Sequence, residues 1–228
     1  MTSTSESSVH GELPSTQPEK CRRERAMSEK WKEIPAGLDL LDSVDTLMVR
    51  QRLRTSLNVE GAGSEYIVED RNGRRLYTAL KTEKAQAYCC PWKTQSFELK
   101  LVSCTGFHAV QYETISSCWN NVDVSVPLQG CIATVRKRCS WRLTYDITGA
   151  TNDCFFTVRG ALCSFFAKDT DYEIYEANRV IGRISSWAPT ESYASAVAFQ
   201  FGVTFPKTLG ATAKAVLLGA CFLVSFTS

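Results

Sequence analysis

An apolar run near the end of the chain constrains the fold more than any other segment. In "KAVLLGACFLVSFTS" the ten residues Ala215 to Val224 carry no charge, and Lys214 precedes them. At about 1.5 Å per residue, a helix of that length covers about half of a ~30 Å hydrocarbon core. A helix that is apolar on every side and too short to span a bilayer is typically buried in protein. We therefore predict a helix at about 210–226 inside a fold that can enclose it, with membrane insertion as the open alternative. Its central residues are Ala215, Val216, Leu217, Leu218, Gly219, Ala220, Cys221, Phe222 and Leu223.

The preceding sequence can supply such an enclosure. A short helical turn is predicted around 38–45, followed by alternation through Leu47, Val49 and Gln51. Asn72-Gly73 lies between two alternating runs and predicts a type I′ hairpin turn. Many short strands at regular spacing favour one antiparallel sheet or barrel. The remaining strand-like segments are "SEYIVED", "RLYTAL", "SFELKLV", "VDVSV", "CIATVRK", "RLTYDI", "CFFTVRG", "DYEIYE", "RVIGRI" and "VAFQFGVTF".

Composition separates a tail from a folded domain. Residues 1–35 are rich in Ser, Thr, Glu and Pro and are predicted to form a disordered tail, while 36–228 form the domain. The first twenty residues hold no apolar signal core, so we expect a protein that is not secreted and keeps its ten cysteines reduced. Lys plus Arg number 26 against 24 Asp plus Glu, so the net charge of +2 predicts no strong general attraction to nucleic acid.

The residue types needed for metal binding or catalysis are sparse. The cysteines Cys89 and Cys90 are adjacent, no Cys-x-x-Cys occurs, and His10 and His108 are the only histidines. These spacings do not suit a zinc site. No nucleophile elbow, phosphate-binding loop or catalytic triad is recognisable, so no catalytic residue and no metal ligand are predicted.

Two charged segments remain as candidates for binding. "VRKRCSWR" gathers Arg136, Lys137, Arg138 and Arg142 around Trp141, which suits an anionic lipid surface or nucleic acid. An ordinary exposed hairpin is the alternative. In "DTDYE", 169–173, three acids alternate, which is typical of a solvated strand face rather than a calcium loop.

Several segments together resemble a known family. "FGVTFPKTLGATAKAVLLGACFL", 201–223, resembles the C-terminal signature of the phospholipid scramblases, and "IPAGLDLLDSVDTLMVRQ", 34–51, resembles their opening segment. "NGRRLYTALK", "SFELKLV" and "DTDYEIYEANRVIGRISSW" are also similar. The resemblance implies a mainly β fold, a Tubby-like closed antiparallel barrel of about twelve strands around a central hydrophobic C-terminal helix. It also implies calcium-dependent, ATP-independent movement of phospholipids between leaflets, by a protein on the cytoplasmic face of the plasma membrane.

The chain departs from the family at the implied calcium site. The positions where the family carries acidic ligands are occupied here by Val197, Phe199, Thr208 and Gly210. No carboxylate side chain lies after Glu191. Because calcium needs several oxygen ligands, we expect its binding at this site to be weak or absent.

The resemblance also implies a thioacylated run of cysteines, and this chain has fewer cysteines in the matching region. Cys89, Cys90 and Cys118 are the candidates for acylation, while buried cysteines that behave as small hydrophobes are the alternative for most of the ten.

Two functions follow as expectations. The first is phospholipid scrambling, with the phospholipid membrane and its anionic headgroups as partners. The second is a membrane-associated regulatory barrel that binds lipid or protein without scrambling.

Overall fold

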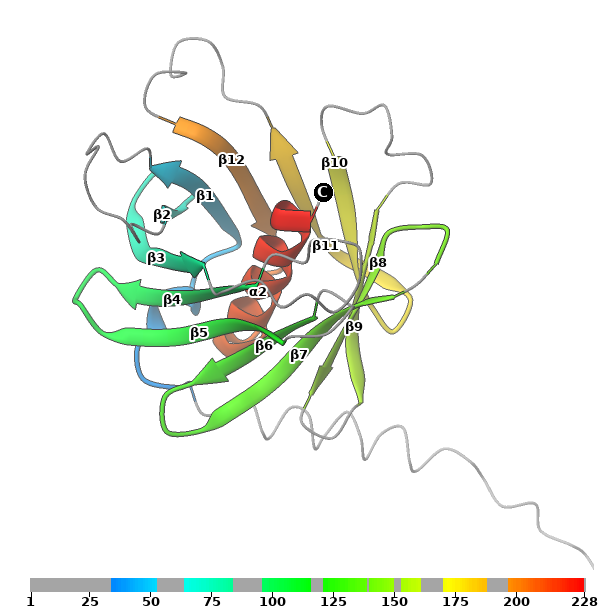
Figure 1. The fold of residues 1–228 in the computed structure, drawn as a ribbon, viewed down its shortest axis with the longest axis horizontal. Coiled ribbons are helices and arrows are strands. Elements are labelled where there is room, and N and C mark those ends of the chain that lie inside the picture. The colour runs from blue at the N-terminus through cyan, green and yellow to red at the C-terminus, as the bar shows by residue number, and fades with distance from the viewer. Residues whose placement is uncertain are drawn as a thin grey trace, which may run out of the picture. The chain divides into compact units, whose positions relative to one another are not determined.

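The computed structural model describes residues 34–52, 64–83, 96–115, 121–138, 140–149, 153–160, 170–187 and 197–227. All of them belong to one compact unit, Ile34–Ser228. The predicted tail, 1–35, lies almost wholly outside the described residues and stays a prediction. Within the unit, twelve antiparallel strands close into a barrel, which confirms the predicted fold class (Figure 1).

The strands follow one another around the barrel in sequence order. Each pairs with the next, and β1 also pairs with β12, where Leu47 lies opposite Val203 and closes the sheet. A one-turn 3₁₀ helix, η1 (Asp39–Leu41), precedes the first strand. The strands are β1 (Thr46–Arg52), β2 (Glu65–Asp70), β3 (Arg75–Glu83), β4 (Phe97–Ser103), β5 (His108–Ile115), β6 (Asn121–Val126), β7 (Gly130–Arg138), β8 (Thr144–Gly149), β9 (Cys154–Gly160), β10 (Thr170–Glu176), β11 (Arg179–Trp187) and β12 (Val197–Thr204).

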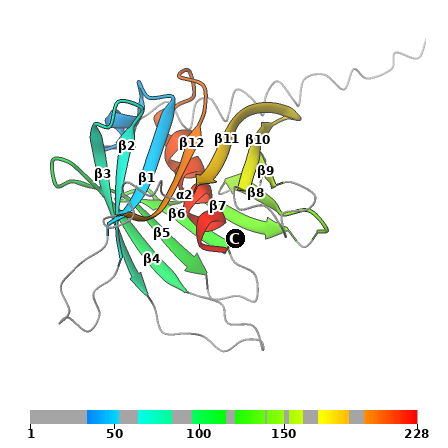
Figure 2. The same ribbon diagram turned by 90° about the horizontal axis from the view of Figure 1, so that it is seen from above.

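In most strands alternate described residues point into the barrel, and the last helix fills it. Leu99 and Leu101 of β4, and Val122 and Val124 of β6, are buried between less buried neighbours. The helix α2 (Ala211–Thr227) runs through the middle of the barrel, as Figures 1 and 2 show. Every residue of α2 from 211 to 224 is buried. This agrees with the length argument, which placed an all-round apolar helix inside the fold.

One strand was missing from the sequence-based segments, namely β5. Its register with β4 shifts between Leu101 and Val102, because Ala109 is an extra residue between His108 and Val110. Ala109 and Val110 are both buried, so the usual alternation is broken at this β-bulge. A search for alternating residues therefore passes over it.

The predicted turn type at Asn72-Gly73 is wrong, although a hairpin does form there. Gly73 has a φ of 78°, whereas Asn72 is not among the residues with positive φ. The Gly73 amide donates to the Asp70 carbonyl, and the Asp70 carboxylate accepts from the Asn72 and Arg74 amides. This carboxylate organises the turn in a way that the Asn-Gly pair alone does not indicate.

The turn with positive φ at both central residues lies instead between β10 and β11. Ala177 and Asn178 have φ values of 46° and 72°, and Glu176 and Arg179 are paired on either side of them.

No helix among the described residues is both long enough and apolar enough to cross a membrane.

Candidate functional site

The most constrained polar group of the described residues is Lys214, in the first turn of α2. Its ammonium donates to the carbonyl oxygens of Leu41 at 3.0 Å, Asp42 at 2.7 Å and Lys207 at 3.0 Å. The side chain is fully buried, and it also lies 5.7 Å from the centre of the Phe205 ring. One lysine thus joins the segment before β1 to the loop before α2.

Burial also governs the protonation of this lysine. Desolvation lowers the pKa of Lys214 from its usual value, while the nearby carboxylates of Asp42 and Asp45 act in the opposite direction. The main-chain carbonyls supply the hydrogen bonds that a buried ammonium needs. Nothing in the sequence indicates that Lys214 binds main-chain carbonyls, because it appears there only as a polar residue before an apolar run.

The middle of α2 is held against β5 and β6. The Tyr112 hydroxyl donates to the Ala215 carbonyl at 2.9 Å, inside the barrel. A Cβ atom on Gly219 would lie 2.7 Å from the Tyr112 ring and 3.3 Å from Val124, so only glycine lets the helix approach this closely. The helix therefore has a defined rotation and depth within the barrel.

Aromatic rings surround the other end of α2. The Phe222 ring lies 5.8 Å from that of Tyr112 and 5.5 Å from that of Phe201, measured between centroids. Phe226 packs at 5.0 Å against Phe97, and the Lys81 ammonium lies 4.5 Å from the Phe226 centroid. The segment is therefore packed as a core element, with Lys214 of its own first turn at one end and Lys81 of β3 against the other.

The positions at which the family resemblance implies calcium ligands are spread over the strand and the loop that lead into α2. Val197 and Phe199 belong to β12, and their side chains lie outside the described residues. Thr208 and Gly210 are exposed in the loop that follows. No group of three or more His, Cys, Asp or Glu side chains that could hold a metal exists among the described residues. Neither a hydroxyl nor a glycine replaces the carboxylates that calcium needs, so the residues present do not fit the ion.

The candidate acylation sites Cys89, Cys90 and Cys118 lie outside the described residues. The described free cysteines are Cys104, Cys131 and Cys154, which are exposed, and Cys221, which is buried in α2. The interpretation as buried small hydrophobes therefore holds for Cys221 and is wrong for the other three. Burial raises the pKa of the Cys221 thiol, which keeps it protonated and unreactive.

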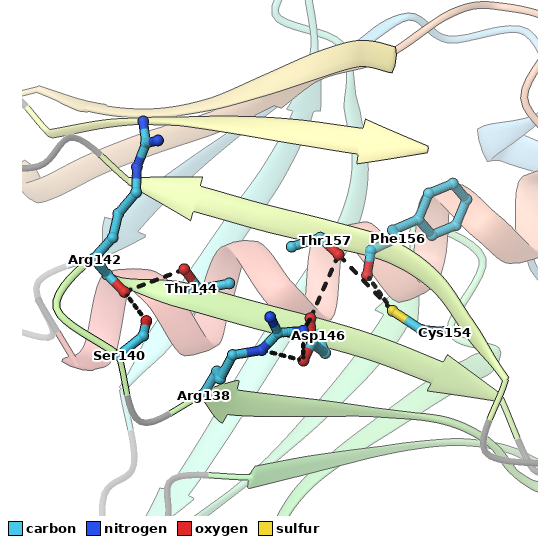
Figure 3. Close-up of polar contacts among 8 residues, drawn as sticks. All are labelled: Arg138, Ser140, Arg142, Thr144, Asp146, Cys154, Phe156 and Thr157. Carbon is cyan, nitrogen blue, oxygen red and sulfur yellow. Dashed lines mark hydrogen bonds and ion pairs between the residues drawn. The ribbon is translucent and has the colours of Figure 1, made fainter. Parts of the chain in front are cut away.

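The predicted basic cluster is a hairpin end between β7 and β8, with Trp141 at its tip. Figure 3 shows that Arg138 points to Asp146, with three contacts of 2.6 to 2.9 Å. Arg142 donates from Nε to the Gly160 carbonyl. Because of these contacts, two of the four basic side chains are already engaged within the protein.

The other two basic side chains have no such partner among the described residues. No ion pair joins Arg136 or Lys137 to another side chain in the part of the chain that the structure describes, and Trp141 is fully exposed. Ser140 and Thr144 both donate to the Arg142 carbonyl and shape the connection (Figure 3). We call Arg136, Lys137, Arg138, Trp141 and Arg142 the basic hairpin.

Comparison with known proteins assigns the chain to a family. A family model described as Scramblase matches residues 26–228. Phospholipid scramblase 1 of Mus musculus is 24% identical over 208 residues, which cover 84% of this chain and 63% of that protein. Phospholipid scramblase 2 of Homo sapiens is 25% identical over 208 residues, with 84% and 70% covered. Phospholipid scramblase family member 5 of Homo sapiens is 24% identical over 211 residues, with 85% and 77% covered.

The chain spans 63% and 62% of the lengths of the mouse and rat relatives, slightly less than two thirds. No solved structure gives a significant match. The family model nevertheless extends from before η1 to the end of α2, over the whole barrel and its central helix. The chain therefore belongs to the scramblase family.

Proposed function

We propose that this protein is scramblase-like and moves phospholipids in both directions between bilayer leaflets without ATP. The observation that carries the proposal is the family match over 26–228, since the relatives found in the comparison are phospholipid scramblases. Scrambling changes no covalent bond. It requires only a lower barrier for carrying a polar headgroup through hydrocarbon, where each unsatisfied polar group costs several kcal/mol.

The filled interior restricts how such movement occurs. Because α2 occupies the barrel axis and is buried from 211 to 224, a lipid cannot pass through the folded barrel along its axis. Headgroups must instead move along the outer surface, or the helix must first leave the barrel. The Tyr112 and Lys214 contacts oppose the second route. We therefore favour an outer-surface route.

The second candidate function is a membrane-associated regulatory barrel that binds lipid or protein and does not scramble. The packed helix favours it because it blocks the barrel axis, and the neutral residues at the implied calcium positions favour it because they weaken calcium binding. Reconstitution in liposomes with a fluorescent lipid, followed by quenching of the outer leaflet, separates the two. Scrambling exposes nearly all the label to the quencher, whereas a binding barrel leaves about half of it protected.

Calcium should have little effect on this protein. In a calorimetric titration of the purified chain we expect little heat, because neutral side chains occupy the family's acidic positions. Lipid movement in the liposome assay should correspondingly be similar with calcium and with chelator. Binding tighter than about 10⁻⁵ M would contradict this expectation. Asp171 and Glu173 of β10 would then be the first residues to replace.

Attachment to the cytoplasmic face of the plasma membrane should need two signals. The basic hairpin contributes at most about 1 kcal/mol for each basic residue near an anionic leaflet, and salt weakens this attraction. A single acyl chain on Cys89, Cys90 or Cys118 is likewise marginal. We expect hydroxylamine, which cleaves thioesters, to release most of the protein at physiological salt.

The same fractionation has a built-in control. Treatment with salt alone should release less protein than hydroxylamine and salt combined. Protein that resists the combined treatment but dissolves in detergent would show that the segment from Ala211 is inserted in the bilayer rather than packed in the barrel.

A further inference from the structure

A groove lies beside the start of α2, where the β10–β11 hairpin meets the loop that follows β12. Its volume is about 480 Å³. Gly182 of β11 permits the close approach on that side, since a Cβ there would lie 2.1 Å from the Thr204 carbonyl oxygen. The lining residues come from both segments and include Glu176, Arg179, Val180, Pro206, Thr208 and Leu209.

The groove carries one negative and one positive side chain, and neither forms an ion pair with another of the described residues. Glu176 and Arg179 are paired across the two-residue turn at 177–178. Neither makes an ion pair or a side-chain hydrogen bond with another residue in the described part of the chain. By contrast, Arg183 on the same hairpin lies 3.5 Å from the carboxylate of Asp171. The two groove charges are therefore available to a ligand.

The other lining residues leave the groove electrically neutral. Thr208 supplies a hydroxyl, and Pro206 and Leu209 supply apolar walls. Lys207 does not line the groove, and its ammonium lies 3.9 Å from Asp45. A ligand with one anionic and one cationic group a few bonds apart matches this arrangement better than a ligand with net charge.

The location of the groove favours a lipid as the source of that ligand. In an antiparallel barrel the turns after β4, β6 and β10 lie at the end where β12 leads into α2. Three of the exposed large apolar side chains lie at this end, namely Phe107, Leu128 and Val180, and Leu128 is completely exposed, whereas Trp141 of the basic hairpin lies at the opposite end of the barrel. Apolar side chains at one end of a barrel suit the interface of a bilayer. We call this the helix-entry end.

We propose that this groove binds the zwitterionic phosphodiester headgroup of a membrane phospholipid. The Arg179 guanidinium donates to the phosphate oxygens, and the negative charge of the Glu176 carboxylate attracts the cationic ammonium or trimethylammonium group. A guanidinium can donate two parallel hydrogen bonds to a phosphate, which fixes the orientation of the headgroup. The proposal deepens the proposed function by naming a headgroup class, but it does not require that the bound lipid crosses the bilayer.

The test is a titration of the purified full chain with dihexanoyl phosphatidylcholine below its micelle concentration. Binding is followed by amide chemical shifts. We expect Arg179→Gln to weaken binding at least about tenfold, the equivalent of 1.4 kcal/mol. Glu176→Gln should weaken it several-fold. The matched control, Arg183→Gln, removes a similarly exposed arginine on the same hairpin and should change the affinity less than twofold.

Two further ligands identify the source and the charge preference. Glycerophosphocholine, which has the headgroup without acyl chains, should bind more weakly than the short-chain lipid, since it cannot use the apolar helix-entry end. Dihexanoyl phosphatidylserine, which is net negative, should also bind more weakly because of Glu176. Equal binding of glycerophosphocholine would overturn the lipid source, and tighter binding of phosphatidylserine would overturn the zwitterion preference.

Unchanged affinity in the Arg179 and Glu176 variants would reject the site itself. The liposome assay is independent of this result. Headgroup binding without scrambling would refute the proposed lipid movement and leave this site standing. Scrambling without headgroup binding would refute this site and leave the proposed lipid movement standing.

Discussion

Replacing Leu218 by Asp should abolish the folded barrel. Leu218 is completely buried near the middle of α2, with apolar side chains on either side of it in the helix. A carboxylate placed there loses its water, and the nearest cation of the helix, the Lys214 ammonium one turn earlier, is already bound to three main-chain carbonyls. We therefore expect a cost of more than about 4 kcal/mol. Because single domains are stable by only about 5 to 15 kcal/mol, such a loss leaves little or no folded protein.

Circular dichroism and urea denaturation of the purified variant measure the effect. Leu218→Met is the matched control, because it keeps the volume and apolar character of the side chain and should cost less than about 1.5 kcal/mol. An Asp variant with an unchanged urea midpoint and weaker membrane binding would contradict the packed arrangement. It would mean that α2 is held by lipid rather than by the barrel.

The predictable part of this structure is the part that rests on local patterns. Strand alternation and the ten-residue apolar run indicate an antiparallel sheet or barrel that encloses a helix, because each depends on neighbouring residues alone. The closed form with about twelve strands followed only from the family resemblance. The strand β5 was missed where a bulge buries Ala109 and Val110 in succession. The turn at Asn72-Gly73 was misassigned because Asp70 organises it. Both errors arise where a longer-range pairing or a side chain overrides the local pattern.

The polar contacts of the helix could not be foreseen from the sequence. Tyr112 and Ala215 are 103 residues apart, and Lys214 and Leu41 are 173 apart, so no spacing rule connects them. The groove beside Glu176 and Arg179 likewise depends on segments that are distant in sequence, since it exists only where β11 is packed against the loop after β12. The sequence could predict the residues of candidate sites with a local signature, such as the basic hairpin. It could not predict which of their charges are free to bind a ligand. Their use depends on which charges the fold has already paired.

Replacing Lys214 by Met should destabilise the protein by about 2 to 3 kcal/mol. The substitution keeps most of the side-chain volume but leaves three main-chain carbonyls without this donor. Buried acceptors that lose a partner cost about 1 to 3 kcal/mol each, partly offset here because an ammonium no longer has to be buried. Lys207→Met is the matched control. Its side chain is 70% exposed and pairs with Asp45 only at 3.9 Å, so its loss should cost less than about 1 kcal/mol.

The pH dependence of this difference tests the buried ammonium directly. The pKa of Lys214 is lowered in the folded state relative to 10.5, so between the two values the unfolded chain binds more protons. The stability of the parent protein therefore rises with pH in that interval, relative to Lys214→Met, which has no group to titrate there. Urea denaturation of both proteins at pH 7 and near pH 10 should show a larger difference in unfolding free energy, parent minus Lys214→Met, at the higher pH. A gap that narrows would mean that the fold favours the charged lysine, and that the three carbonyls outweigh the loss of water around it.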